Sequence, residues 1–143
     1  MMKRLEYLHG ITPEECDRLR ELGVRHTNQL IHATTLVIDR ERIARRAGIP
    51  VERLYALGQQ ASLFEISGLQ RHLRVLMRLG ISTLRQLAQA DPAELHRRLS
   101  EAVGTSAPGP SDVDYWVSQA RCIDVVEDPE ETTATRIRRY VPG

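Results

Sequence analysis

The stretch LFEISGL at residues 63–69, followed by a helical pattern and then by LGI at residues 79–81, decides the fold of this chain. An earlier stretch repeats it, because LEYLHGI at residues 5–11 leads through a helical pattern into LGV at residues 22–24. In both copies a leucine follows the second glycine by seven residues. A helix that turns back within a few residues needs a positive φ, which glycine adopts without steric cost. The pattern predicts two helix-turn-helix repeats, at residues 5–35 and 63–90.

The remainder of the chain is also helical in pattern. Thr12 is followed by a proline and two glutamates, a capping box that starts a helix, and Asp91 starts another helix in a similar way. The pattern of residues 39–60 predicts a pair of helices that links the two repeats and is joined by a Gly-Ile turn. A helix that opens at Ser111 has Trp116 on its apolar stripe, so we expect this ring in the core. We expect about nine short helices in total.

Short helices joined by an apolar-x-Gly-apolar turn resemble the helix-hairpin-helix motif. The spaced elements from Arg42 to Trp116 resemble, more narrowly, the bacterial family catalogued as domain of unknown function 4332, over roughly residues 5–123. This resemblance implies an all-α fold: a compact single domain of tandem helix-hairpin-helix repeats with a closing C-terminal helix. The expected boundaries are 1–123 for the domain and 124–143 for an extended tail that is first acidic and then basic.

Composition indicates a globular protein. Of the 143 residues, 41% are hydrophobic and 27% are charged, and no window approaches the ~20 apolar residues of a membrane span. The amino terminus lacks the apolar core of a secretory signal, so we expect a cytoplasmic protein with no membrane partner. Two cysteines and five scattered histidines offer no metal-ligand spacing. We therefore expect neither a metal nor a cofactor.

Charge is nearly balanced overall but unevenly distributed. The formal net charge is +1, and nineteen of the twenty basic residues are arginine. Residues 36–100 have eleven basic and six acidic side chains, whereas residues 101–143 have four and eight. Arginine is suited to bidentate phosphate contacts, so the basic middle of the chain is where an anionic partner is expected.

The two hairpins differ in what they offer a phosphate. In helix-hairpin-helix proteins that hold nucleic acid, the hairpin presents backbone N–H groups at a helix amino terminus. Such hairpins usually read Gly-apolar-Gly, whereas Thr12 and Gln70 replace the second glycine here. Glu14 and Glu15 occupy the helix start at the first hairpin and would repel a phosphate, so we interpret that hairpin as structural.

The second hairpin is the candidate site, because neutral and basic side chains follow its glycine and an arginine face continues along the same expected helix. The candidate nucleic-acid-binding residues are Gly68, Gln70, Arg71, His72, Arg74 and Arg78. The same arginines also fit the solvated face of an ordinary amphipathic helix, so the pattern by itself leaves both interpretations open.

No catalytic motif is present, and we expect a protein that is not an enzyme. Helix-hairpin-helix glycosylases that act through a Schiff base need a lysine nucleophile, but Lys3, the only lysine, lies outside both repeats. The leading hypothesis is a non-catalytic module that binds the backbone of DNA or RNA without sequence preference. The alternative is a protein-protein interaction adaptor or scaffold, which would bind a protein partner and no nucleic acid, with little dependence on salt.

Overall fold

The structure is a computed structural model that describes residues 3–124 and 126. The helices of this part are α1 (Pro13–Glu21), α2 (Thr27–Thr35), α3 (Val37–Ala47), α4 (Val51–Phe64), α5 (Leu73–Arg78), α6 (Leu84–Gln89), α7 (Pro92–Val103) and α8 (Pro110–Ile123). Short 3₁₀ turns occur at Leu5–Tyr7, Gln70–His72 and Gly104–Ser106. The expected all-α fold is confirmed. None of the described helices is long and apolar enough to cross a membrane. The tail predicted over 124–143 lies outside the described residues, apart from positions 124 and 126.

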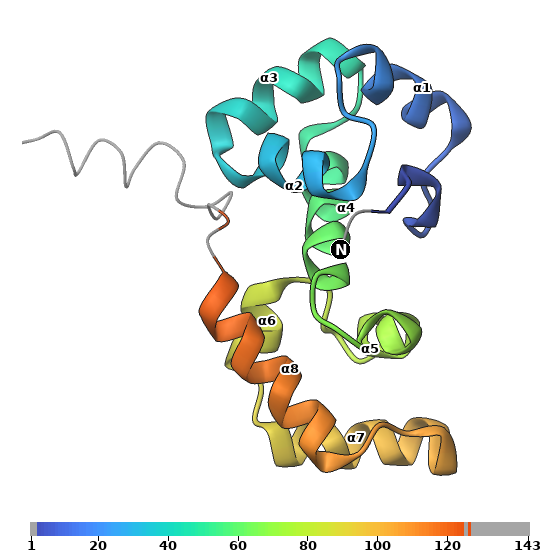
Figure 1. The fold of residues 1–143 in the computed structure, drawn as a ribbon, viewed down its shortest axis with the longest axis vertical. Coiled ribbons are helices and arrows are strands. Elements are labelled where there is room, and N and C mark those ends of the chain that lie inside the picture. The colour runs from blue at the N-terminus through green and yellow to red at the C-terminus, as the bar shows by residue number, and fades with distance from the viewer. Residues whose placement is uncertain (1–2, 125, 127–143) are drawn as a thin grey trace, which may run out of the picture.

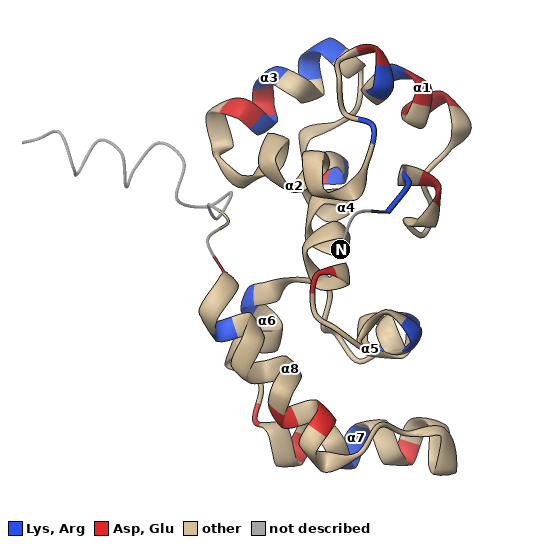
Figure 2. Cartoon of the chain, viewed as in Figure 1, with Lys and Arg blue, Asp and Glu red and all other residues tan. Residues whose placement is uncertain are grey.

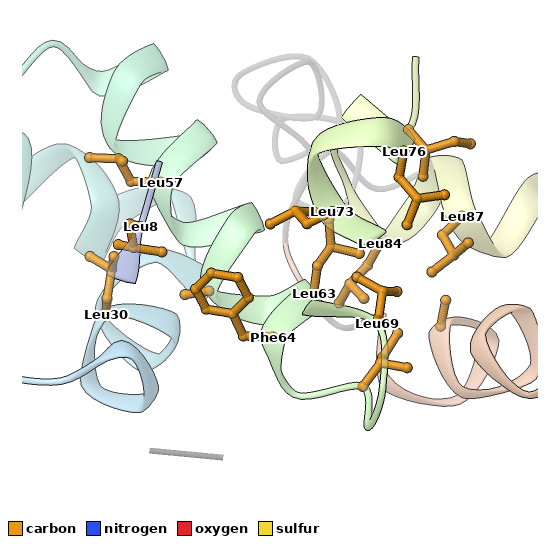
Figure 3. Packing of buried hydrophobic residues seen from close by; sticks show 14 of the residues in the cluster. Leu8, Leu30, Leu57, Leu63, Phe64, Leu69, Leu73, Leu76, Leu84 and Leu87 are labelled. Carbon is orange, nitrogen blue, oxygen red and sulfur yellow. The ribbon is translucent and has the colours of Figure 1, made fainter. Parts of the chain in front are cut away.

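Helix α4 stands at the centre of the molecule, with α1, α2 and α3 around one end and α5 to α8 around the other (Figure 1). Every residue of α4 from Leu57 to Phe64 is buried. Figure 3 shows the apolar side chains continuing from Leu8, Leu30 and Leu57 through Phe64 to Leu69. Both repeats therefore share one core, and α4 runs on past residue 60, where the predicted linking pair ends.

Helices α2 and α4 approach each other very closely at Gly58. A Cβ atom at this position would overlap Thr34 Oγ1 and would stand 2.9 Å from Thr34 Cβ. Thr34 is itself held in place, because its hydroxyl donates to the Leu30 carbonyl at 2.8 Å. The glycine is required here by packing rather than by backbone conformation, since a close-packed interior leaves no room for another methyl group.

The two copies of the repeat end their first helix in the same way. In each, the residue after the glycine donates its N–H to the carbonyl five residues earlier, at 2.9 Å. A glutamine six residues after the glycine then accepts from two backbone N–H groups just before the next helix. The glycines have φ values of +86° and +89°, which side-chain-bearing residues rarely adopt. The matching residues are Leu19, Gly23, Val24 and Gln29 in the first copy and Leu76, Gly80, Ile81 and Gln86 in the second.

The copies differ at the start of that helix. The predicted capping box of the first copy is present, with Thr12 Oγ1 accepting from the Glu15 N–H at 3.2 Å and Glu15 Oε1 accepting from the Thr12 N–H at 2.9 Å. In the second copy Leu69 provides no side-chain cap, and a 3₁₀ turn precedes the short α5. The regular helix that follows the second hairpin and includes Arg74 and Arg78 is therefore shorter than the sequence predicts. The second copy has one residue fewer than the first between its hairpin glycine and its turn glycine. A 3₁₀ turn rises about 2.0 Å per residue, more than an α-helix, so it lengthens this shorter stretch.

Two adjacent buried glutamines of α4 each hold one copy. The Gln60 side chain accepts from the His9 N–H at 3.0 Å and donates to the His9 carbonyl at 3.2 Å, which fixes the first hairpin. The Gln59 side chain accepts from the Leu84 N–H at 3.0 Å, at the start of α6. Because buried amides are costly to leave unpaired, these bonds set the position of both copies against α4.

Arg53 of α4 holds the first hairpin from its exposed side. Its guanidinium donates to the Gly10 carbonyl at 2.6 Å and binds both oxygens of the Glu15 carboxylate. The hydrogen bonds from Arg53 lower the pKa of Glu15 from 4.5 to about 2. The carboxylate is thus engaged with α4 and with the helix cap at once.

Helix α8 closes the core at the other end of α4. Trp116 is 2% exposed, so its predicted place in the core is confirmed. The helix begins at Pro110, one residue before the expected start at Ser111. Asp112 caps this helix, since its Oδ2 accepts from the Gly109 N–H at 3.1 Å.

The substitution Gly58→Ala tests the close approach of α2 to α4. In an exposed helix, alanine in place of glycine would stabilise by up to ~1 kcal/mol. Here the added methyl group overlaps Thr34, and overpacking of this kind costs roughly 1–3 kcal/mol, so we expect a lower free energy of unfolding in urea. The second substitution Thr34→Ala should recover part of the loss. A Gly58→Ala variant that is more stable than the parent would contradict the packing described.

The pH dependence of stability tests the contact between Arg53 and Glu15. A carboxyl group whose pKa is lowered on folding stabilises the protein above its unfolded pKa, and this contribution is lost as pH falls from 4.5 towards 2. We expect Arg53→Gln to lower the unfolding free energy by about 1 kcal/mol at neutral pH and by much less near the acid end of that range. The matched control is Arg46→Gln, at an exposed arginine of α3. An equal loss at both pH values would contradict the assignment.

Candidate functional site

Basic residues dominate the segment between α4 and α7, whose two acidic residues, Glu65 and Asp91, stand at its ends. Residues 66–90 include Arg71, Arg74, Arg78 and Arg85 and no aspartate or glutamate. In Figure 2, α5 shows basic residues only, whereas α1 and α3 mix both signs of charge. Positive potential is therefore concentrated around α5, although the whole chain has a net charge of only +1.

Three arginines of this segment are exposed and form no ion pair with any residue that the structure describes. They are Arg71, Arg74 and Arg78. By contrast, Arg97 binds two glutamates of its own helix, and Arg85 binds Asp124. An unpaired guanidinium has no ion pair to give up when it binds an anion, so these three are available to a ligand.

An open groove of about 490 Å³ lies between α5 and the first hairpin. Arg74, Met77 and Arg78 line it from α5, and His9 and Gly10 line it from the hairpin. We call it the arginine groove. No carboxylate is among these lining residues. Side chains of α4 hold the wall that the first hairpin forms, and the other wall comes from α5 of the second repeat.

A smaller pocket of about 190 Å³ lies at the second hairpin, beside the start of α8. We call it the hairpin pocket. Its lining includes Ser67, Gly68, Arg71, His72, Asp112 and Trp116. This pocket combines a permanent cation, a carboxylate and an indole, so its chemistry differs from that of the arginine groove.

Two rings form part of the wall of the hairpin pocket. The His72 and Trp116 centroids lie 5.4 Å apart with the ring planes tilted by 42°. Burial, with a further effect of the Arg71 charge, lowers the pKa of His72 from its usual value. Trp116 Nε1 donates to no described residue and faces Gly68, since a Cβ there would stand 3.9 Å from it.

The hairpins also differ in their backbone donors. The N–H groups of Gly68, Gln70 and Arg71 donate to no residue within 3–124 or to 126. At the first hairpin, side chains accept from the N–H groups of His9 and Thr12. Because a backbone donor is rarely left without an acceptor, the amides of the second hairpin are open to water or to a ligand.

The predicted site residues divide between the two cavities. Gly68, Arg71 and His72 line the hairpin pocket, whereas Arg74 and Arg78 line the arginine groove. Gln70 is among the lining residues of neither. The arginine face that the sequence presents as one surface is thus shared by two neighbouring spaces.

Sequence analysis missed other members of the two cavities. His9 lies opposite α5 only because α4 brings the repeats together, and no local pattern signals this contact. Asp112 stands at a helix start, where a carboxylate indicates a cap. The apolar stripe around Trp116 indicates a core position correctly, but it does not show that the indole N–H lacks a partner.

Exposed apolar side chains mark a different surface. Leu36 and Ile38, at the joint between α2 and α3, are 44% and 61% exposed. A separate open cavity of about 500 Å³, between the second half of α3 and the start of α4, is lined by Ala44, Ile49 and Val51 together with the charged Glu41 and Arg45. Exposed apolar groups of this kind are suited to contact with a protein partner.

Comparison with known proteins places the chain in a family. No curated protein and no solved structure matches it. A family model described as Domain of unknown function (DUF4332) matches residues 9–123, a span that includes both hairpins, α4 and the closing helix. The match covers most of the 143 residues and agrees with the resemblance noted in the sequence. This protein therefore belongs to the family described as domain of unknown function DUF4332.

Proposed function

We propose that this protein is a non-catalytic module that binds the sugar-phosphate backbone of DNA or RNA in the arginine groove, without sequence preference. The observation that carries the proposal is that Arg74 and Arg78, both without an ion pair among the described residues, line a groove with no carboxylate. In this proposal the two repeats are tandem helix-hairpin-helix units. The first hairpin, which its sequence indicates to be structural, supplies one wall of the groove through His9 and Gly10, and the helix after the second hairpin supplies the other.

The chemistry of the groove favours a polyanion over a single small ligand. Arginine binds phosphate oxygens bidentately, and each phosphate contact releases counterions, which is a favourable term at low salt. The groove is open, so a chain of phosphates can pass through it. Its side chains are His9, Arg74, Met77 and Arg78. In this proposal the two arginines contact phosphates rather than base edges, so binding does not depend on sequence.

The small net charge of +1 does not oppose the proposal, because the local arrangement of charge governs a surface of this size. Exposed charges are screened beyond about 8 Å at physiological ionic strength. A phosphate in the groove therefore responds mainly to α5 and its neighbours. It meets His9 and Gly10 on one wall and, on the other, side chains of the segment 66–90, which contains no acidic residue.

A protein adaptor is the second candidate, and the exposed Leu36 and Ile38 favour it. A protein partner would cover the exposed apolar side chains between α2 and α3. Its binding would depend little on salt. The two candidates use different residues. Substitution on one surface therefore leaves the other intact, and the two can be tested separately.

The salt dependence of binding to a labelled DNA duplex tests the arginine groove. We expect binding to weaken steeply between about 50 and 200 mM salt, and Arg74→Gln and Arg78→Gln each to reduce the slope of log affinity against log salt by about 0.9. Arg46→Gln, at an exposed arginine of α3, is the matched control and should leave the slope unchanged.

Two results would contradict the proposal. One is the absence of salt-sensitive binding to duplex and to single strands. The other is an equal loss of affinity in the control and in the groove variants, which would indicate a general charge effect. Binding to a protein partner that Ile38→Asp abolishes, with no affinity for nucleic acid, would favour the adaptor.

A further inference from the structure

We propose that the hairpin pocket is a binding site for a phosphate group that carries a proton, as in inorganic phosphate or a singly ionised phosphomonoester. Ser67, Gly68, Arg71, Asp112 and Trp116 define the site. This inference goes beyond the proposed function, since it concerns a different cavity and a different ligand from the phosphodiester backbone.

The indole of Trp116 is the first argument for a ligand. The residue is 2% exposed, yet its Nε1 donates to no described residue and faces the Gly68 turn of the pocket. The indole N–H reaches solvent through the pocket, since it is not among the buried polar atoms that lack a partner in the described part of the chain, and it is therefore open to a ligand acceptor. An acceptor atom bound in the pocket would satisfy it.

The other donors make the acceptor an oxyanion. Arg71 is exposed, permanently charged and without an ion pair in the described part of the chain. The backbone N–H groups of Gly68 and Arg71 donate to no described residue. Indole, guanidinium and backbone donors together call for several oxygens pointing in different directions. A tetrahedral phosphate meets this need better than a planar carboxylate, which has two oxygens.

Asp112 restricts which oxyanion fits. Its Oδ2 accepts from the Gly109 N–H at 3.1 Å, and its other oxygen has no partner among the described residues. A carboxylate only accepts hydrogen bonds, so a group beside it must offer a proton or be repelled. Inorganic phosphate always has a proton near neutral pH, and a phosphomonoester has one below its second pKa of about 6. Sulfate and phosphodiesters have none.

The size of the pocket agrees with a single phosphate group. Its volume of about 190 Å³ is less than half of that of the arginine groove, at about 490 Å³. A phosphate fits such a space, whereas a chain of nucleotides needs an open path. The His72 ring, which packs on Trp116, forms one side of the pocket. The ligand is therefore either free phosphate or the phosphorylated end of a larger molecule.

The indole N–H of Trp116 provides a direct readout, because it is the only tryptophan of the chain. In the full-length protein labelled with ¹⁵N, its resonance should shift saturably with inorganic phosphate at about pH 6, and sulfate at equal ionic strength should bind at least about tenfold more weakly. Arg71→Gln should weaken phosphate binding at least about tenfold. Asp112→Asn keeps an oxygen for the Gly109 cap and should remove the preference for phosphate over sulfate.

Controls separate this site from the arginine groove and from general charge effects. Arg46→Gln should bind phosphate like the parent. Arg74→Gln, which weakens backbone binding under the proposed function, should also leave the phosphate titration unchanged, so the two proposals fail independently. To identify the source, a nucleoside monophosphate and a 5′-phosphorylated oligonucleotide are compared with inorganic phosphate. Tighter binding of either one assigns the phosphate to the end of that molecule.

Three outcomes would overturn the proposal. The Trp116 resonance does not respond to phosphate, or sulfate binds as well as phosphate to the parent protein, or Arg71→Gln and Arg46→Gln have the same effect. The amide spectrum of each variant should be as well dispersed as that of the parent, which shows that the variant is folded. A lost response to phosphate then reports a change at the site.

Discussion

The contact between Gly58 and Thr34 is the constraint on which the rest of the structure depends. It lets α2 lie directly against α4, and with the first hairpin and α6 on other sides every residue from Leu57 to Phe64 is buried. Burial in turn makes the polar groups of Gln59 and Gln60 costly to leave unpaired, and they bind one repeat each. One close helix crossing thus fixes both repeats relative to a single helix.

The arginine groove follows from this arrangement, whereas the hairpin pocket depends on α8. The arginine groove exists because His9, fixed by Gln60, faces the arginines that follow the second hairpin. The hairpin pocket exists because α8 closes the core with Trp116 beside the Gly68 turn. Neither space belongs to one repeat alone or to one helix alone. The proposed backbone binding in the arginine groove depends on how the repeats are packed, so variants that loosen α4 should weaken it without touching a ligand.

Local signals in the sequence predict much of this fold. The turn glycines Gly23 and Gly80, the capping box at Thr12 and the buried Trp116 are all found as expected, because each depends on short-range geometry or on helical period. The 3₁₀ start of the second arginine-bearing helix was not predictable from the apolar spacing alone. The division of the predicted site between two cavities depends on contacts between distant segments, which no local pattern encodes.

The central claim is that packing of the two repeats against α4 creates the proposed binding surface. It is tested by adding a DNA duplex at low salt to the ¹⁵N-labelled chain and mapping the changes in amide chemical shift. The account predicts that the largest shifts occur together at His9, Gly10 and Arg74 to Arg78, on segments far apart in sequence. Shifts confined to one repeat, or centred on Ile38 in α3, would contradict it.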